Sequence, residues 1–134
     1  MLLGCAQQEQ RPRSANDINE ACGLEMQAAR TAIRLREKNK PKTQLKQQLA
    51  PLTADSSRLL FNMHQILDEV YAHPQLNAVI YPVYRFQLCT QQLQNKLLAH
   101  NIDRNLTGLL ACRAQYNTTS SNESTQCVLD TFNH

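Results

Sequence analysis

The sequence predicts an all-α protein, a bundle of four to five helices held together by two disulfides. Apolar residues recur at steps of three and four over most of the chain, and no alternating strand pattern of useful length occurs. The 134 residues include only 3 Gly, too few for the tight turns of a β-sandwich or for a glycine-rich phosphate loop. A chain of this length fits one domain of roughly 100–150 residues with a substantial core.

The first expected helix runs from about 15 to 39. Ser14, Asn16 or Asp17 can cap its start, and Pro41 prevents its continuation. Its expected apolar face contains Ile18, Cys22, Ala29 and Ile33. The position between Cys22 and Ala29 is filled by either Glu25 or Met26.

A short helical turn through Leu45–Leu49 comes next, followed by a strongly amphipathic helix. Thr53 or Asp55 is the expected cap of that helix, whose apolar stripe extends over 59–71 and stops before Pro74. These signals predict two separate elements in this part of the chain.

The helical period resumes at Leu76 and extends to about His100. Pro82 interrupts it, and must either kink the segment or begin a new helix. A further short helix is expected over 102–110, although Gly108 weakens it by roughly 1 kcal/mol relative to alanine.

The segment 117–125 is entirely polar and rich in Ser and Thr, which predicts a loop. We expect residues 14–134 to form a single helical domain and residues 1–13 to be a disordered tail that carries a lipid anchor.

The tail contains Leu2-Leu3-Gly4-Cys5 directly before a polar stretch. These four residues resemble a bacterial lipobox, in which a small residue precedes a cysteine that is lipidated and becomes the new N-terminus. The resemblance implies that Cys5 is the anchor, and Ala6 after it implies sorting to the outer membrane. The alternative is a disordered tail with an incidental cysteine.

Setting Cys5 aside leaves an even number of cysteines, and an exported compartment is oxidising enough for them to pair. Their spacing contains no Cys-x-x-Cys motif, which argues against a zinc ribbon or a thioredoxin motif. Three pairings are possible. We favour Cys22 with Cys89, because both lie on apolar stripes of separate helices, and Cys112 with Cys127, because these two flank the polar segment.

The chain also resembles small exported helical proteins of proteobacteria. The likeness covers about half of the chain and adds support for the helical fold. It rests on the spacing of Cys22, Tyr71, Pro74, Tyr84, Phe86 and Cys89.

The net charge of +3 is unevenly distributed. Seven of the 14 basic residues lie between positions 30 and 46, where Glu37 is the single acid, so this segment carries +6. The pattern predicts a dock for an anionic surface or an acidic partner, and the alternative is a solvated helix face. Nucleic acid is disfavoured because no aromatics are interleaved with the charges. The predicted basic face consists of Arg30, Arg34, Lys38, Lys40 and Lys42.

Aromatic residues gather around the two prolines at 74 and 82. Tyr81, Tyr84 and Arg85 are candidates for a recognition pocket, because tyrosine and arginine are favoured at binding hot spots. The alternative is that they belong to the core beside Cys22 and Cys89, with Tyr81 the most exposed of them.

Nothing in the sequence indicates an enzyme. Asp68 and Glu69 are adjacent on a helix and therefore point to different faces, so they cannot work as an acid and base pair. No two histidines among His64, His73 and His100 have the spacing that places two metal ligands on one helix face. We expect no catalytic residue, metal or other cofactor.

These observations predict a non-enzymatic lipoprotein of the bacterial periplasm, anchored to the outer membrane and touching the membrane only through its lipid. It would bind another envelope protein, through a groove or the basic face, as an adaptor or assembly chaperone, and no small-molecule substrate is expected. In type it resembles the secretion-system pilotins, which hold an amphipathic helix of an outer-membrane channel subunit. The alternative function is an immunity or inhibitor protein that neutralises a periplasmic toxin or hydrolase.

Overall fold

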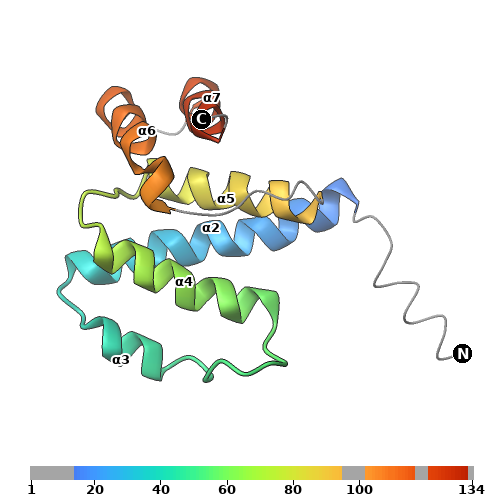
Figure 1. Ribbon diagram of the computed structural model, residues 1–134, viewed down its shortest axis with the longest axis vertical. Helices are drawn as coiled ribbons and strands as arrows, with labels where there is room; N and C mark the ends of the chain where they lie inside the picture. Colours follow the sequence, from blue (N-terminus) through green and yellow to red (C-terminus); the bar gives the residue numbers. More distant parts are fainter. Residues whose placement is uncertain (1–13, 95–101, 117–120, 133–134) are drawn as a thin grey trace, which may run out of the picture.

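The computed structural model describes residues 14–94, 102–116 and 121–132, and within these ranges all regular elements are helices (Figure 1). The all-α bundle with two disulfides is therefore confirmed, with six helices in the described parts of the chain rather than four to five. The helices are α2 (Ala15–Glu37), α3 (Lys42–Gln47), α4 (Arg58–Ala72), α5 (Ile80–Leu93), α6 (Ile102–Gln115) and α7 (Asn122–Thr131).

The ends of α2 follow from its flanking residues. The Ser14 hydroxyl accepts a hydrogen bond from the Asp17 amide at 3.2 Å and caps the start. At the other end Asn39 adopts a φ of 61°, and the Lys40 amide donates to the Leu35 carbonyl at 3.0 Å. This is a Schellman ending, which asparagine tolerates better than most residues and which turns the chain before Pro41.

The next long helices begin at caps other than those expected. Ser57, rather than Thr53 or Asp55, caps α4 by accepting a hydrogen bond from the Leu60 amide at 3.1 Å. For α5, the Asn77 side chain accepts hydrogen bonds from two amides just before and at the helix start. Pro82 lies in the first turn of α5, where its missing N–H would have no helical partner, so it begins a helix rather than kinking one.

The expected polar loop over 117–125 is wrong for 122–125, which form the first turn of α7. Ser121 and Ser124 build a reciprocal capping box there: the Ser121 hydroxyl accepts from the Ser124 amide at 3.1 Å, and the Ser124 hydroxyl accepts from the Ser121 amide at 2.8 Å. Polar residues that suggested a loop therefore start a helix. The expected tail over 1–13 lies outside the described residues.

The long helices form a layer in which α2 lies between α4 and α5 (Figure 1). The short α3 packs on α4, while α6 and α7 pack on each other and on α5. In Figure 1, α2, α4 and α5 are seen from the side, whereas α6 and α7 are seen nearly along their axes. The C-terminal pair therefore crosses the layer at a large angle.

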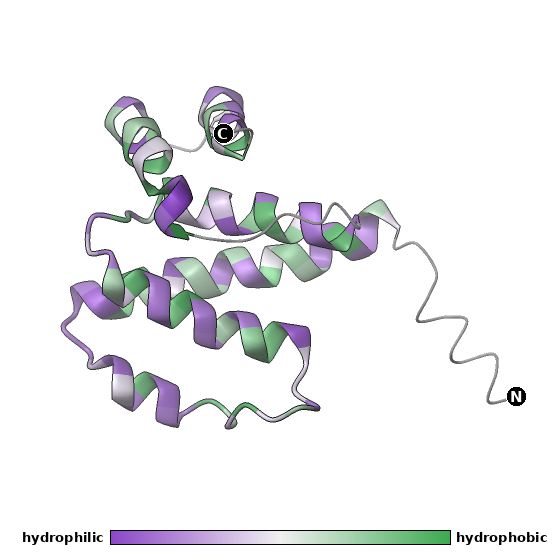
Figure 2. Cartoon of the chain, viewed as in Figure 1, coloured by the Kyte–Doolittle hydropathy of each residue, from purple (hydrophilic) through white to green (hydrophobic). Residues whose placement is uncertain are grey.

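Hydrophobic and hydrophilic residues alternate along the helices, as expected for amphipathic elements around a core (Figure 2). The main core contains buried side chains of α2, α4 and α5, such as Ile33, Val70 and Leu88, and continues into α6 and α7 through Leu109 and Val128. No helix in the described parts of the chain is both long and apolar enough to cross a membrane.

Both favoured disulfides are present. Cys22 of α2 is bonded to Cys89 of α5, with 5.4 Å between their Cα atoms, and with Ile18 they form a small second apolar cluster. Cys112 of α6 is bonded to Cys127 of α7, with a Cα separation of 5.8 Å. Each disulfide joins two helices that also pack against each other.

Candidate functional site

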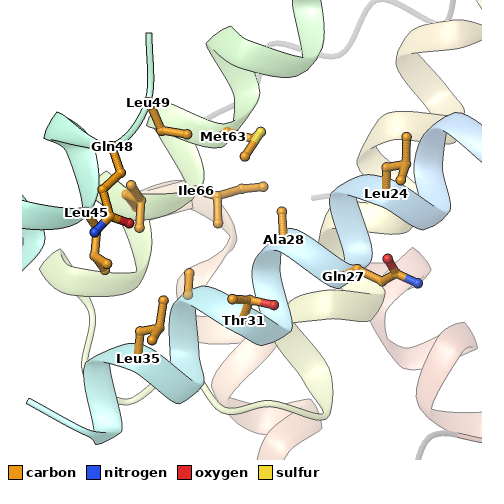
Figure 3. Close-up of a pocket in the computed structure, with 12 residues that line it drawn as sticks. Leu24, Gln27, Ala28, Thr31, Leu35, Leu45, Gln48, Leu49, Met63 and Ile66 are labelled. Carbon is orange, nitrogen blue, oxygen red and sulfur yellow. The ribbon is translucent and has the colours of Figure 1, made fainter. Parts of the chain in front are cut away.

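An open groove of about 320 Å³ runs over α4 between α2 and the α3 segment (Figure 3). It exists because α2 and α3 both pack on α4 but make few contacts with each other. None of its lining residues carries a charge. They are Leu24, Gln27, Ala28, Thr31, Ala32, Leu35, Leu45, Gln48, Leu49, Met63, Ile66 and Leu67.

One wall of this groove is rigidly held. Ala28 of α2 faces Ile66 of α4 across the groove in Figure 3. The disulfide at Cys22 fastens α2 to α5, on the other side of α2 from α4. We therefore expect the α2 wall to keep its position when the groove is occupied.

The opposite wall is held by fewer and more exposed interactions. Leu45 is the one buried residue of α3. Lys46 pairs with the half-exposed Asp68 of α4 at 2.7 Å, and the His64 ring bonds to the Ala50 carbonyl at 3.0 Å. Exposed ion pairs of this kind contribute about 0–1 kcal/mol each, so they add little to the burial of Leu45 in holding the α3 wall.

The predicted basic face is divided by the structure. Arg34 lies three residues after Thr31, and Lys38 three residues after Leu35, so both stand beside groove residues on the outer side of α2. Both are exposed, and no carboxylate of the described residues lies within ion-pair distance of either. These two cations give the α2 edge of the groove a positive charge.

The other members of the basic face lie in different surroundings. Arg30 is partly exposed on α2, and Lys40 is exposed in the turn after it. Lys42 pairs with Asp68 at 3.5 Å, which places it with α4 instead of the groove edge. The structure therefore does not bring all five residues together as one face.

Arg36 belongs to the same basic segment but has a structural role. Its guanidinium donates to the carbonyls of Val70, His73 and Leu76 at 2.8, 3.2 and 2.7 Å. It thereby satisfies backbone acceptors at the C-terminal end of α4 and in the turn that follows. Part of the sequence charge is thus used to connect α2 to α4.

The prediction that Tyr81, Tyr84 and Arg85 contact a partner is wrong, because all three side chains are fully buried in α5. Tyr81 was expected to be the most exposed, and it has none of its surface exposed. The first turns of α5 are covered on several sides, by α2, α6 and α7. These three residues therefore belong to the core, which was the alternative interpretation of the sequence.

Arg85 is part of a buried network of charges between α2, α4 and α5. Its Nη2 atom donates to Glu25 Oε1 at 3.0 Å, and its Nη1 atom lies 3.4 Å from Glu69 Oε1. Arg58, at the start of α4, donates from Nη1 to the second Glu25 oxygen at 2.8 Å. Two guanidiniums and two carboxylates balance each other, as buried charges require.

The network also sets the state of its members. Burial lowers the pKa of Arg85, but the charges of Glu69 and Glu25 raise it above its usual value, so Arg85 stays charged. Burial and then the Glu69 charge raise the pKa of Tyr81 well above its usual value. Tyr81 is therefore a neutral donor, and its hydroxyl bonds to Glu69 Oε1 at 2.6 Å.

The sequence analysis allowed for a groove but did not predict the residues that line it, and the buried network was not predicted. The groove has a partial sequence signal, because Leu24, Ala28 and Leu35 form a second apolar stripe on the first helix beside the core stripe. The sequence also contained an indication of the network, because Glu25 places a carboxylate at a possible core position of the first helix. Cys5, the expected lipid anchor, lies outside the described residues.

Comparisons of the chain with known protein families, with curated proteins and with solved structures find no match. The geometry above is therefore the basis for a function.

Proposed function

We propose that this protein is a non-enzymatic adaptor or assembly chaperone of the bacterial envelope that holds an amphipathic helix of another envelope protein in the groove between α2, α3 and α4. The uncharged, apolar groove is the observation that carries the proposal. An amphipathic helix that lies in an apolar groove is a recurring mode of protein recognition.

The dimensions and charge of the groove favour a helix. From Leu24 to Leu35 it follows α2 for about 16 Å, roughly three turns of helix. It is open to solvent along this length, with Leu24 about half exposed. A small apolar ligand would stay partly in water there, whereas a helix can bury one face and leave the other solvated. Arg34 and Lys38 favour acidic residues along the edge of that helix.

Two further features support an envelope location. Disulfides persist in oxidising compartments such as the periplasm, and this chain has two. The lipobox-like Leu2-Leu3-Gly4-Cys5 supports a lipid anchor at Cys5 and thereby attachment to the outer membrane. The absence of catalysis is part of the proposal, since the buried Glu25 and Glu69 are each paired with an arginine.

Site-specific photocrosslinking in intact envelopes tests this proposal. A photoreactive amino acid at Thr31, which is exposed and lines the groove, should crosslink to a partner segment with apolar residues at helical spacing. Phe61, also exposed but outside the groove, provides the comparison position. Mass spectrometry of the crosslinked peptide identifies the segment.

A groove-filling substitution makes the test specific. Ala28→Trp should abolish the Thr31 crosslink, because the indole occupies the space of the partner helix. Ala114→Trp, on an exposed position of α6, is the matched control and should leave the crosslink intact. Melting curves establish that both variants fold. If Ala28→Trp is folded and the crosslink persists, the proposed function is wrong.

The positive edge gives a second measurement. Replacing Arg34 and Lys38 together by glutamate should weaken binding of the crosslinked segment several-fold at low salt, and the difference should shrink as salt is added. Equal binding by this variant and the parent protein at low salt would remove the basic edge from the site.

A further inference from the structure

The groove does not end at Leu24. A second hollow of about 230 Å³ follows it, and Leu24 lines both. Its apolar walls include Leu59 and Leu93, and its lining also includes two members of the charged network, the buried Glu25 and the partly exposed Arg58. From Ala21 to Leu35 the two hollows follow α2 for about 21 Å. The first is lined by uncharged residues, and the second, at the Ala21 end, is lined in part by Glu25 and Arg58.

The charges at this end alternate from the interior to the surface. Glu69, Arg85 and Glu25 are nearly or fully buried, whereas the Arg58 side chain is 36% exposed. Glu25 already pairs with two cations, since one of its carboxylate oxygens contacts Arg85 and the other contacts Arg58. The outermost charge of the network is therefore the Arg58 cation, which lies at the mouth of the second hollow.

Arg58 also has unused hydrogen-bonding capacity. Its Nη1 atom donates to Glu25 and lies 3.7 Å from Cys89 Sγ, and its Nη2 atom donates to the Gln92 side chain at 2.5 Å. A guanidinium has five N–H groups, so donors remain after these contacts within the described residues. Because Arg58 is the first residue of α4, the positive end of that helix adds to its charge.

We propose that Arg58 receives an acidic side chain near one end of the bound helix, and that this pairing, rather than the apolar groove, fixes the orientation in which the helix binds. A carboxylate continues the alternation of charges and can take two parallel hydrogen bonds from a guanidinium. A basic side chain there would meet Arg58 with a like charge, and a neutral side chain would offer its remaining N–H groups a weaker acceptor. The inference rests on the proposed function and adds the chemistry of the partner at one end of the site.

A double-mutant cycle on the partner segment identified from Thr31 tests this pairing. The probe is a synthetic peptide of that segment, compared with peptides in which each Asp or Glu is changed singly to its amide. For the parent protein, one such change near an end of the peptide should weaken binding roughly 10- to 100-fold, since a charge-assisted hydrogen bond is lost.

The protein variants of the cycle are Arg58→Gln and Arg58→Lys. Arg58→Gln should bind the acidic and the amide peptide equally, and Arg58→Lys, which keeps the charge beside Glu25, should restore part of the difference. Melting curves show whether each variant is folded. Because the peptide carries the second change, the result does not depend on how much the Arg58 variants lose in stability.

The two proposals fail in different ways. If Ala28→Trp abolishes peptide binding but no acidic position is coupled to Arg58, the groove stands and the assignment of Arg58 is wrong. If Ala28→Trp binds the peptide as tightly as the parent protein, the proposed function itself is overturned.

Discussion

Arg85 is a charged side chain with none of its surface exposed to solvent. Removing such a charge from water costs several kcal/mol, and close opposite charges can offset that cost. Glu25 and Glu69 provide those charges from two other helices, at 3.0 and 3.4 Å. The three residues are therefore interdependent, since each is tolerated in the core because the others are present.

Arg85→Met should destabilise the protein by about 3–5 kcal/mol, because it removes a buried cation from between two buried carboxylates. Urea denaturation measures the change in the free energy of unfolding. The matched control is Arg34→Met on the exposed side of α2, expected to change stability by no more than about 0.5 kcal/mol. Equal effects of the two substitutions would show that the buried ion pairs are not formed.

The sequence could not locate this network. Glu25 and Met26 compete for the same position on the first helix, and the hydrophobic pattern alone favours neither. The structure buries Glu25 because cations from α4 and α5 converge on it, over separations of 33 and 60 residues. Partners so far apart in sequence become neighbours only through tertiary packing, which periodicity within one helix does not specify.

At the scale of helices, local signals predicted most of the elements. Pro41 and Pro74 separate the first helices as expected. The apolar stripes identify part of the buried faces, but α4 also buries the polar residues Asn62, His64 and Glu69. The start of α7 was missed because Ser and Thr suit both loops and caps. The groove was missed because it depends on the spacing between α2 and α3, a property of two helices and not of either sequence segment.

The contact between α6 and α7 explains a residue that local rules disfavour. Gly108 lies within α6, where alanine would be preferred by about 1 kcal/mol. A Cβ atom at this position would lie 2.7 Å from the Thr131 methyl group of α7. Gly108 therefore allows the two helices to approach each other, and the Cys112–Cys127 disulfide joins the same pair.

Gly108→Ala should destabilise the protein by about 1 kcal/mol, because crowding worth about 1–3 kcal/mol outweighs the gain in helix propensity. Thr131→Ser removes the crowded methyl group and keeps the hydroxyl that donates to the Val128 carbonyl at 2.7 Å. In the Thr131→Ser background, Gly108→Ala should be close to neutral. Thermal unfolding of all four proteins measures this coupling, and additive effects would contradict the proposed contact.

At the scale of the whole molecule, α5 connects the other long helices. Tyr81 bonds to Glu69 of α4, and Arg85 pairs with Glu25 of α2. Tyr84 stacks on Phe132 after α7, with 5.5 Å between ring centroids, and its hydroxyl accepts a hydrogen bond from Asn105 of α6 at 3.3 Å. Global stability should therefore depend on the protonation of groups in α5.

Stability should fall as the pH rises above about 10, the pKa of tyrosine in an unfolded chain. Burial, as the largest cause, raises the pKa of both Tyr81 and Tyr84. Above pH 10 the unfolded chain therefore releases protons that the folded protein retains, and each tyrosine contributes a loss of about 1.4 kcal/mol per pH unit. The stabilising contribution is complete below that pH and is lost as the pH approaches the folded pKa.

Tyr84→Phe isolates half of this effect. The substitution removes one of the two buried tyrosines, so the slope of the unfolding free energy against pH between about 10 and 11 should become less negative by about 1 kcal/mol per unit. The loss of the bond to Asn105 shifts the whole curve but not its slope, and the titration of lysines is common to both proteins. Urea denaturation at a series of pH values measures the two slopes, and parallel curves would mean that Tyr84 ionises equally well in the folded and unfolded states.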